Sequence, residues 1–479
     1  MTRILAEIPL WALVYPPTAI WAAWLWLRAR KSGQSPFDAF PAQFPLALAA
    51  AIYLSTFRWH GGDDIPNSLL PFSLLRHGTL SMEPFRAWFM EKGIAPEFTV
   101  HPGGILISIF PVMPALLALP FFLPAVLFTA QPPELLMHGL SKVSASFLAA
   151  ASVAVFHLLA RERASPRWAA AAALFFAFGT YSFSVSSQAL FQHAPAQLGL
   201  ALGLWGLLCS HPGRKEDWIS GFGFSLAFAS RPDSVFFLAA AGLYLLFRER
   251  RRVPFFSLGA AVPAAFLAYY WLVYTGRLRP QDSDLQGRIF SSFQPEAVAA
   301  LLIGPTRGLL LFVPAAVFGL WGMLKRARDP RALWAPWLAL TLPAIVAFYS
   351  FYSNWTGGQT FGTRYYATSC LILALFILEQ SREISASPLL CRLWGLTFAW
   401  SVLVHAVGAY FTWPGSFSIV EQKAQVWDLS LYPPFYLGSS SGPLFTLPLP
   451  LRWAVAAAAF AAVYFAAKRL SRWLAAPSA

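Results

Sequence analysis

Long apolar segments recur along the whole chain, separated by short polar segments. A transmembrane helix needs about 20 predominantly apolar residues, and most of these segments approach that length. In 218–247, Arg231, Pro232 and Asp233 interrupt the apolar run. Because charges in the membrane interior are costly, we interpret this stretch as two short helices joined at Arg231–Asp233. The pattern thus predicts about 13 transmembrane helices: 8–27, 41–57, 141–160, 167–187, 194–210, both halves of 218–247, 253–275, 308–324, 333–352, 366–380, 393–411 and 448–467.

Basic residues mark one side of the predicted membrane. More than half of the 35 lysines and arginines lie in short loops between the spans, which is typical of cytoplasmic loops. The extracytoplasmic side then holds three long loops, 58–102, 276–307 and 412–447. Residues 103–130 follow the first of these loops and contain several prolines. We expect them to cross the membrane twice or to form a re-entrant element covered by protein.

The composition excludes several other classes of protein. Of the 479 residues, 57% are hydrophobic and 12% are charged, whereas soluble proteins carry about 25% charged residues. The net charge of +14 comes largely from the basic loops and does not indicate a nucleic-acid partner. Cys209, Cys370 and Cys391 lack the spacing of a zinc site or a disulfide framework. We therefore predict an all-α polytopic membrane protein, with residues 1–479 in one transmembrane domain and no separate soluble domain.

Two short helices are predicted in the first extracytoplasmic loop. Asn67 or Ser68 can cap a helix over 67–77, which Gly78 would end. A second helix over 82–92 would end at Gly93. Their apolar faces suggest that both lie on the bilayer surface, with their charged residues at the level of the lipid headgroups.

The adjacent carboxylates Asp63 and Asp64 directly follow a predicted span. In one interpretation they are a solvated pair that marks the end of a helix. In the other, one of them is a general base that takes a proton from an incoming hydroxyl. The residues alone leave both interpretations open.

Four cations lie on the same predicted side of the membrane: Arg231, Arg307, Arg364 and Lys423. Each is a candidate for an interfacial anchor whose charged end reaches the headgroups. Glycines surround Arg307 and Arg364 and permit close approach of the backbone. Because arginine binds phosphate through two parallel hydrogen bonds, these positions would also suit a lipid-linked phosphate.

The histidines do not indicate a metal site. His77 and His101 lie in the first long loop, and His193 is expected in a short extracytoplasmic turn. No second histidine or cysteine stands at ligand spacing. We therefore expect no metal and no other cofactor, and His193 is the best candidate among the histidines for a role in the site.

Four segments of the chain resemble the bacterial GT-C superfamily of integral-membrane glycosyltransferases. The likeness is to the branch that is related to protein O-mannosyltransferases and to the lipid A aminoarabinose transferase. The segments are 63–78, 186–193, 304–308 and 355–364, and they occur in the same order as in related bacterial proteins.

The resemblance implies an inverting sugar transfer from a polyprenyl-phosphate donor at the extracytoplasmic face of the bacterial inner membrane. It also implies that Asp64, or else Asp63, acts as the base. On this reading Arg364, Arg307, Arg231 and His193 are assigned to the donor and its phosphate, and Asn67, Arg76, His101 and Trp355 to the sugar or acceptor. Membrane lipids are expected partners, and lipid, glycan and protein acceptors all remain open. Loop 412–447 is short, unlike the sizeable C-terminal periplasmic domain of related enzymes, which argues against recognition of a large protein acceptor.

Two alternatives remain. An O-antigen ligase or polymerase also spans the membrane many times, but it uses a lipid-diphosphate donor and places its key residues in a long late loop. A transporter or flippase commonly has two related halves with broken helices that meet at the midplane. This chain has no visible repeat, and its acidic motif lies in the first loop, so we favour the glycosyltransferase.

Overall fold

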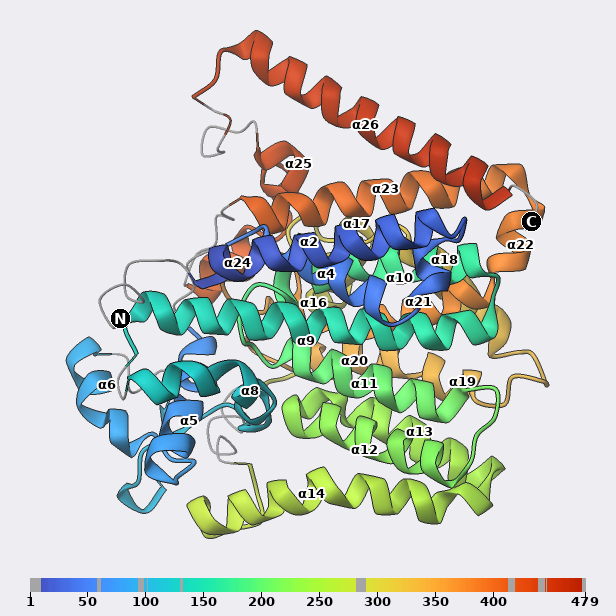
Figure 1. Ribbon diagram of the computed structural model, residues 1–479. Coiled ribbons are helices and arrows are strands. Elements are labelled where there is room, and N and C mark those ends of the chain that lie inside the picture. Colours follow the sequence, from blue (N-terminus) through green and yellow to red (C-terminus); the bar gives the residue numbers. More distant parts are fainter. Residues whose placement is uncertain are drawn as a thin grey trace. The chain divides into compact units, whose positions relative to one another are not determined.

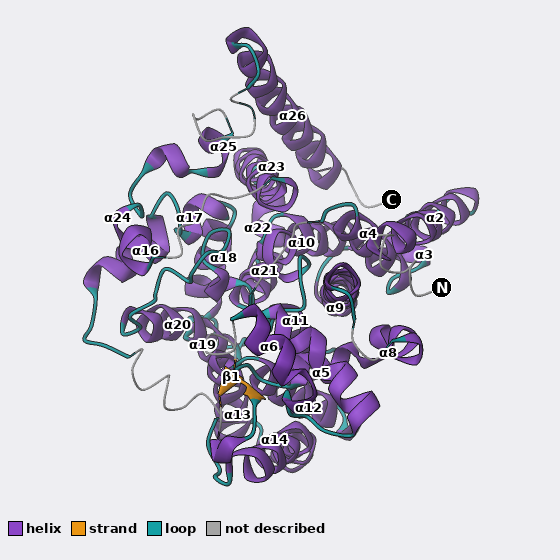
Figure 2. Ribbon diagram, turned by 90° about the vertical axis from the view of Figure 1, so that its left-hand side faces the viewer, coloured by secondary structure: helices purple, strands orange, loops and turns teal. Residues whose placement is uncertain are grey.

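The computed structural model is helical almost throughout (Figure 2). In the part of the chain that it describes, the strands are β1 (Thr99–Val100) and β2 (Ile107–Ser108), which pair antiparallel. This agrees with the predicted all-α class. The described residues are 10–57, 62–93, 99–100, 102–129, 132–280, 290–411, 418–437, 444 and 446–475.

The chain divides into two compact units, and unit 1 comprises the described parts of 1–155, 186–238 and 249–289. Two long helices, α9 and α13, begin in unit 1 and end in unit 2. The helices that begin in unit 1 are α2 (Leu10–Lys31), α3 (Pro36–Ala39), α4 (Gln43–Leu54), α5 (Asp64–His77), η1 (Glu83–Phe85), α6 (Arg86–Lys92), η2 (Pro102–Gly104), α8 (Met113–Phe128), α9 (Glu134–Arg163), α11 (His193–Leu208), α12 (Arg214–Ser230), η4 (Pro232–Ser234), α13 (Val235–Arg248), η5 (Arg250–Arg252) and α14 (Val253–Thr275).

Unit 2 comprises the described parts of 156–185, 239–248 and 290–479. Whether the two units form one transmembrane domain stays a prediction. The helices that begin in unit 2 are α10 (Pro166–Phe178), the π-helical turn η3 (Ser182–Ser186), α16 (Pro295–Ile303), α17 (Leu309–Phe312), α18 (Ala316–Arg326), α19 (Ala335–Ala339), α20 (Thr341–Ser350), η6 (Arg364–Tyr366), α21 (Ser369–Glu379), α22 (Ser381–Ala386), α23 (Pro388–Tyr410), α24 (Ile419–Ala424), η7 (Leu429–Leu431), α25 (Pro433–Tyr436) and α26 (Leu449–Ala475).

Five described helical segments are long and apolar enough to cross a membrane: α2, α9, η5 with α14, α23 and α26. Shorter apolar helices include α4, α8, α10 and α21. These segments make the chain an integral membrane protein, and the number of 13 spans stays a prediction. Some predicted spans are divided, because proline interrupts a helix: Pro314 lies between α17 and α18, within the predicted span 308–324.

Glycines allow three helices of unit 1 to pack at short distance, with α12 between α11 and α14 (Figure 1). A Cβ atom on Gly221 of α12 would lie 1.8 Å from the carbonyl oxygen of Phe256 in α14. One on Gly259 of α14 would lie 2.0 Å from the carbonyl oxygen of Trp218. A larger residue cannot fit there unless the helices separate. The small residues therefore determine how closely α12 and α14 approach.

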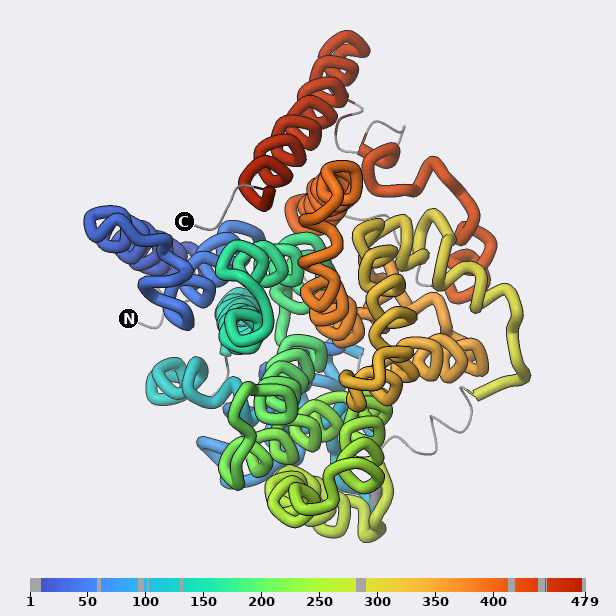
Figure 3. The backbone as a smooth tube through the Cα atoms, turned by 90° about the vertical axis from the view of Figure 1, so that its right-hand side faces the viewer, coloured from blue at the N-terminus to red at the C-terminus, as the bar shows by residue number. Residues whose placement is uncertain are grey.

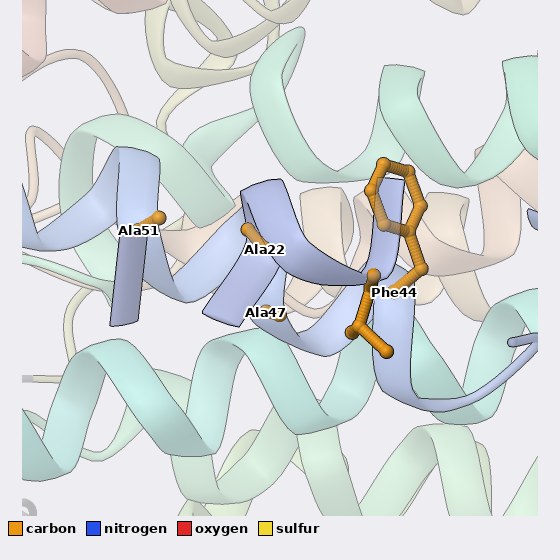
Figure 4. Close-up of a cluster of buried hydrophobic side chains, with 5 residues drawn as sticks. Ala22, Phe44, Ala47 and Ala51 are labelled. Carbon is orange, nitrogen blue, oxygen red and sulfur yellow. The ribbon is translucent and has the colours of Figure 1, made fainter. Parts of the chain in front are cut away.

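Each unit also contains pairs of long helices that pack through small or aromatic side chains. In unit 1, Ala22 of α2 faces Phe44, Ala47 and Ala51 of α4 (Figure 4). The α4 residues follow the spacing i, i+3, i+7, which places them on one face of the helix. In unit 2, α26 lies beside α23 (Figure 3).

The predicted first extracytoplasmic loop contains the two expected short helices, but the first begins earlier than expected. It is α5, which starts at Asp64 and not at Asn67. Pro66 lies in its first turn, where the missing N–H has no helical partner to lose. Consequently Asn67 and Ser68 are buried inside α5, and the prediction that they cap it is wrong. Gly78 and Gly93 end α5 and α6 in the left-handed conformation, as predicted.

Two irregular parts of the pattern can also be compared with the structure. The predicted break at Arg231–Asp233 is confirmed, because η4 separates α12 from α13 there. Between 103 and 129, by contrast, the structure has one long helix, α8, with Pro120 and Pro124 inside it. Two helical crossings are therefore wrong for this stretch.

Candidate active site

Asp64 is a buried carboxylate at the first position of α5 and is 1% exposed. A carboxylate at a helix N-terminus is stabilised by the helix dipole. Its Oδ2 atom accepts a hydrogen bond from Ser141 Oγ at 3.0 Å and lies 3.4 Å from Nδ1 of His138. Its Oδ1 atom is buried without a hydrogen-bond partner among the described residues. Asp63 is only half-buried, so the two adjacent carboxylates lie in different environments.

The surroundings of Asp64 change its acidity in opposing directions. Burial is the largest effect and raises the pKa of the carboxyl above its usual value. His138 and Ser141 oppose this effect through hydrogen bonds and, for His138, through charge, while neighbouring Asp63 adds to it. The net direction of the pKa shift is upward, which makes Asp64 a better proton acceptor than an exposed aspartate.

One face of α9 provides the partners of Asp64. His138, Ser141 and Lys142 have the spacing i, i+3, i+4, so they lie on the same side of the helix. Ser141 Oγ donates to Asp64 and accepts from the backbone N–H of Leu190 at 2.8 Å. Asn67 Nδ2 donates to the carbonyl oxygen of Leu190 at 3.0 Å. A closed ring of contacts thus links α5, α9 and the segment that contains Leu190.

Lys142 is fully buried beside this ring. Its ammonium group donates to Ser187 O at 2.9 Å, to Thr56 Oγ1 at 3.1 Å and to Gln188 Oε1 at 3.3 Å. The sequence pattern did not indicate His138, Ser141 or Lys142 as site residues. A lysine at the edge of the predicted span 141–160 was the signal that could have found them, because ionisable residues within membrane segments are usually functional.

Arg231 and His193, both predicted site residues, lie together in unit 1. The guanidinium of Arg231 donates from Nε to Asp233 at 2.8 Å and from Nη1 to Nδ1 of His193 at 2.9 Å. All three residues are buried. Because a guanidinium only donates, Nδ1 of His193 is the acceptor, and the proton of the neutral ring is on Nε2. His193 is the first residue of α11 and not part of a turn.

The remaining candidates of the first loop differ from one another. Asn67 is engaged with Leu190, as described above, and its Oδ1 atom is buried without a partner in the described part of the chain. Arg76 is exposed, and its Nε atom donates to the carbonyl oxygen of Val126 in α8 at 2.7 Å. His101 lies outside the described residues.

In unit 2, Arg307 holds the glycine-rich segment 357–363. Its guanidinium donates to the carbonyl oxygens of Thr360 and Gly362, both at 2.7 Å, and of Gly358 at 3.1 Å. The hydroxyl of Thr363 donates back to the Arg307 carbonyl oxygen at 2.7 Å. Burial lowers the pKa of Arg307 to about 10, so the side chain remains a cation at neutral pH.

Arg364 follows this segment and is half-buried at the start of η6. Gly357, Gly358 and Gly362 all have positive φ values, which residues with a side chain rarely adopt. A Cβ atom on Gly358 would lie 4.0 Å from Nη2 of Arg364. Since Gly358 also accepts a hydrogen bond from Arg307, the segment brings the two predicted arginines to the same glycine.

Trp355 lies just before this segment and is 1% exposed. Its indole N–H donates to Oε1 of Gln294 at 3.1 Å, and the Lys423 ammonium donates to the same oxygen at 2.9 Å. Lys423 also lies 5.9 Å from the centre of the Trp355 ring, within the range of a cation–π contact. These contacts connect α24 to the start of α16 and to the glycine-rich segment.

No group of three histidine, cysteine, aspartate or glutamate side chains that could hold a metal ion was found within the described ranges. The expectation of a reaction without a metal or other cofactor therefore stays a prediction.

The helical membrane fold of this chain has a counterpart among solved structures, and it agrees with the fold that the sequence resemblance implied. A solved structure with this fold is that of ArnT from Cupriavidus metallidurans bound to undecaprenyl phosphate. It matches with a TM-score of 0.50 and 14% sequence identity, over 90% of this chain and 76% of that chain. At this identity the likeness shows the fold alone. No protein-family model and no curated protein matches the chain.

Proposed function

We propose that the chain is an inverting glycosyltransferase. It would move a sugar from a polyprenyl-phosphate donor to a hydroxyl group at the extracytoplasmic face of the bacterial inner membrane. The observation that carries the proposal is the buried Asp64 carboxylate, whose Oδ1 atom has no hydrogen-bond partner in the described structure. The fold adds support, since the ArnT structure with the same fold was bound to undecaprenyl phosphate.

In the proposed step, Asp64 is the general base. Its carboxylate takes the proton of the acceptor hydroxyl, and the acceptor oxygen forms a bond to the anomeric carbon of the sugar. The bond between that carbon and the phosphate oxygen breaks, and polyprenyl phosphate leaves with the electron pair. A positioned base typically contributes about 10²–10⁴-fold in rate. Asp64 is favoured over Asp63 because hydrogen bonds hold Asp64 in one orientation.

We assign the donor phosphate to the arginines. Arg364 is the ligand we favour in unit 2, because it is less buried than Arg307 and lies beside glycines that leave room for a phosphate. Arg307 contributes positive charge there and holds the segment. Arg231, with His193, is a second buried cation in unit 1. Such cations stabilise the negative charge that develops on the departing oxygen.

The sugar and the acceptor are proposed to contact Trp355, Asn67, Arg76 and His101, and no metal is required. The proposal is tested on purified protein in lipid nanodiscs. A panel of polyprenyl-phosphate monosaccharides is offered with cell-envelope extract as the acceptor source, and release of free polyprenyl phosphate is measured. We expect release by the wild type and by Asp63→Asn, and a loss of at least about 10²-fold in Asp64→Asn.

Each other result changes the proposal in a defined way. Normal release by Asp64→Asn with a loss in Asp63→Asn transfers the role of base to Asp63. Normal release by both variants removes the base from the mechanism. No release from any monophosphate donor, combined with turnover of a lipid-diphosphate donor, indicates a ligase or polymerase. Uptake or flipping of a labelled lipid without any transfer indicates a transporter.

A further inference from the structure

His138 of α9 is the ionisable side chain that the structure places against the proposed base. Its Nδ1 atom lies 3.4 Å from Oδ2 of Asp64, and the two side chains are 5% and 1% exposed. The residues are 74 positions apart in the sequence, so this contact exists only in the folded chain. An imidazole at such a distance from a buried carboxylate affects both its charge and its orientation.

We propose that His138 is a positioning residue for Asp64, which keeps the carboxylate ionised and leaves its Oδ1 atom to receive the proton. The proposal rests on the assignment of Asp64 as the base. Ser141 donates a hydrogen bond to Oδ2, and Nδ1 of His138 lies 3.4 Å from the same oxygen. Oδ1 is then the atom with free acceptor capacity within the described structure. The acceptor proton would be transferred to Oδ1, and His138 would remain on the other oxygen throughout the step.

The other charged groups near Asp64 do not take this role. Asp63 precedes it in the chain and opposes ionisation, because two adjacent negative charges repel. Lys142 lies on the same face of α9, and its ammonium donates to Thr56, Ser187 and Gln188. The neighbours that favour the charged form of Asp64 are His138, whose effect is the larger, and Ser141.

The test measures the ionisation of Asp64 directly, without any substrate. Protein labelled with ¹³C-carboxyl aspartate is titrated in nanodiscs and followed by infrared spectroscopy. Each variant is compared with its own Asp64→Asn derivative, so the difference spectrum contains the Asp64 band alone. His138→Leu removes the imidazole and its contact with Oδ2. His138→Asn keeps an N–H near the position of Nδ1 but carries no charge.

A matched control is available on the same helix. His157 is also fully buried in α9, and the structure gives it no contact with Asp64. His157→Leu therefore removes a buried imidazole from the same helix without changing the contact between His138 and Asp64. Size-exclusion chromatography and thermal unfolding establish that each variant is folded.

We expect the titration midpoint of Asp64 to rise by about one pH unit or more in His138→Leu, which is at least a tenfold change in the protonation equilibrium. His138→Asn should give a smaller rise, and His157→Leu none. The acidic limb of the kcat/KM profile should move to higher pH in the same order. An unchanged midpoint in folded His138→Leu overturns the proposal, even if transfer is lost.

The two proposals can fail separately. If Asp64→Asn retains wild-type turnover, Asp64 is not the base, although the midpoint in His138→Leu can still be shifted. If Asp64→Asn is inactive but the midpoint is the same with and without His138, the base remains and the positioning role of His138 is excluded.

Discussion

Replacement of Arg307 tests whether this residue binds the donor phosphate or supports the backbone of residues 357–363, two roles that the sequence could not distinguish. The sequence analysis assigned Arg307 to the donor phosphate, whereas the structure places three of its hydrogen bonds on backbone carbonyl oxygens of the glycine-rich segment. Lysine keeps the positive charge but lacks the planar fork of donors. If Arg307 acts by holding the segment, Arg307→Lys and Arg307→Ala should therefore reduce the stability of residues 357–363 and donor binding to a similar extent. If only the charge of Arg307 matters, Arg307→Lys should reduce donor binding much less than Arg307→Ala.

The structure gives the size of the expected loss. The bond to Gly362 is buried, and a buried carbonyl oxygen left without a partner costs about 1–3 kcal/mol. The bonds to Thr360 and Gly358 are partly buried, so each contributes about 0.5–1.5 kcal/mol. Together, Arg307→Ala should destabilise the segment by about 2–6 kcal/mol. Arg307→Lys should recover at most one of the three bonds.

Hydrogen exchange of residues 357–363 in nanodiscs measures this local loss, and titration with a polyprenyl-phosphate donor measures its consequence for binding. Arg326→Lys is the matched control. Arg326 lies in a predicted cytoplasmic loop, and its guanidinium donates to Asp329 at 2.8 Å and to the carbonyl oxygen of Glu379 at 3.2 Å. The affinity for the donor should therefore not change in this variant. Wild-type protection of 357–363 in Arg307→Lys would refute the reasoning and return Arg307 to a role through charge alone.

Three further variants test the packing and electrostatics of unit 1. Asp64→Asn should be more heat-stable than the wild type at pH 8 but not at pH 4. The raised pKa of Asp64 means that folding favours the protonated form, so the stability of the wild type falls as the carboxyl ionises. An equal difference in stability at both pH values would contradict this. Gly221→Ala should lower the free energy of unfolding by about 1–3 kcal/mol, because its Cβ would lie 1.8 Å from the carbonyl oxygen of Phe256. Gly62→Ala is the control, since a Cβ there meets open space. Equal melting temperatures of the two variants would show that α12 and α14 can separate freely. Ser141→Ala should lower the free energy of unfolding by about 1–3 kcal/mol and Ser141→Thr by much less, since threonine keeps the hydroxyl that donates to Asp64. Similar losses in the two variants would show that the hydroxyl does not contribute to stability.

The sequence predicted those features that depend on neighbouring residues. Gly78 and Gly93 end their helices because glycine readily adopts the left-handed conformation found there. The break between α12 and α13 was predictable because Arg231, Pro232 and Asp233 are consecutive. The start of α5 was predicted three residues too late, since a proline in the first turn is compatible with the helix and Asn67 resembled a cap.

The contacts of the candidate site could not be read from the sequence. Asp64 and Ser141 are separated by 77 positions, and Arg307 and Gly362 by 55. Ser141 and Lys142 were assigned to the predicted span 141–160 and His138 to no span, because hydropathy does not show which side of a helix faces protein. The sequence showed glycines beside Arg307, but the hydrogen bonds of Arg307 to residues 358–362 depend on the fold of that segment.

Asp64 differs in its partners from other carboxylates that the fold shields from water. Near the predicted cytoplasmic ends, Arg252 donates to Asp217 at 2.6 Å and Arg163 to Glu379 at 2.6 Å, so these carboxylates face a full positive charge. Among the described residues, no lysine or arginine contributes to the pKa shift of Asp64, and Oδ1 has no hydrogen-bond partner there. A buried acceptor without a partner costs about 1–3 kcal/mol. A hydroxyl group that donates to Oδ1 would offset this cost, and that is the contact which a general base makes with its substrate.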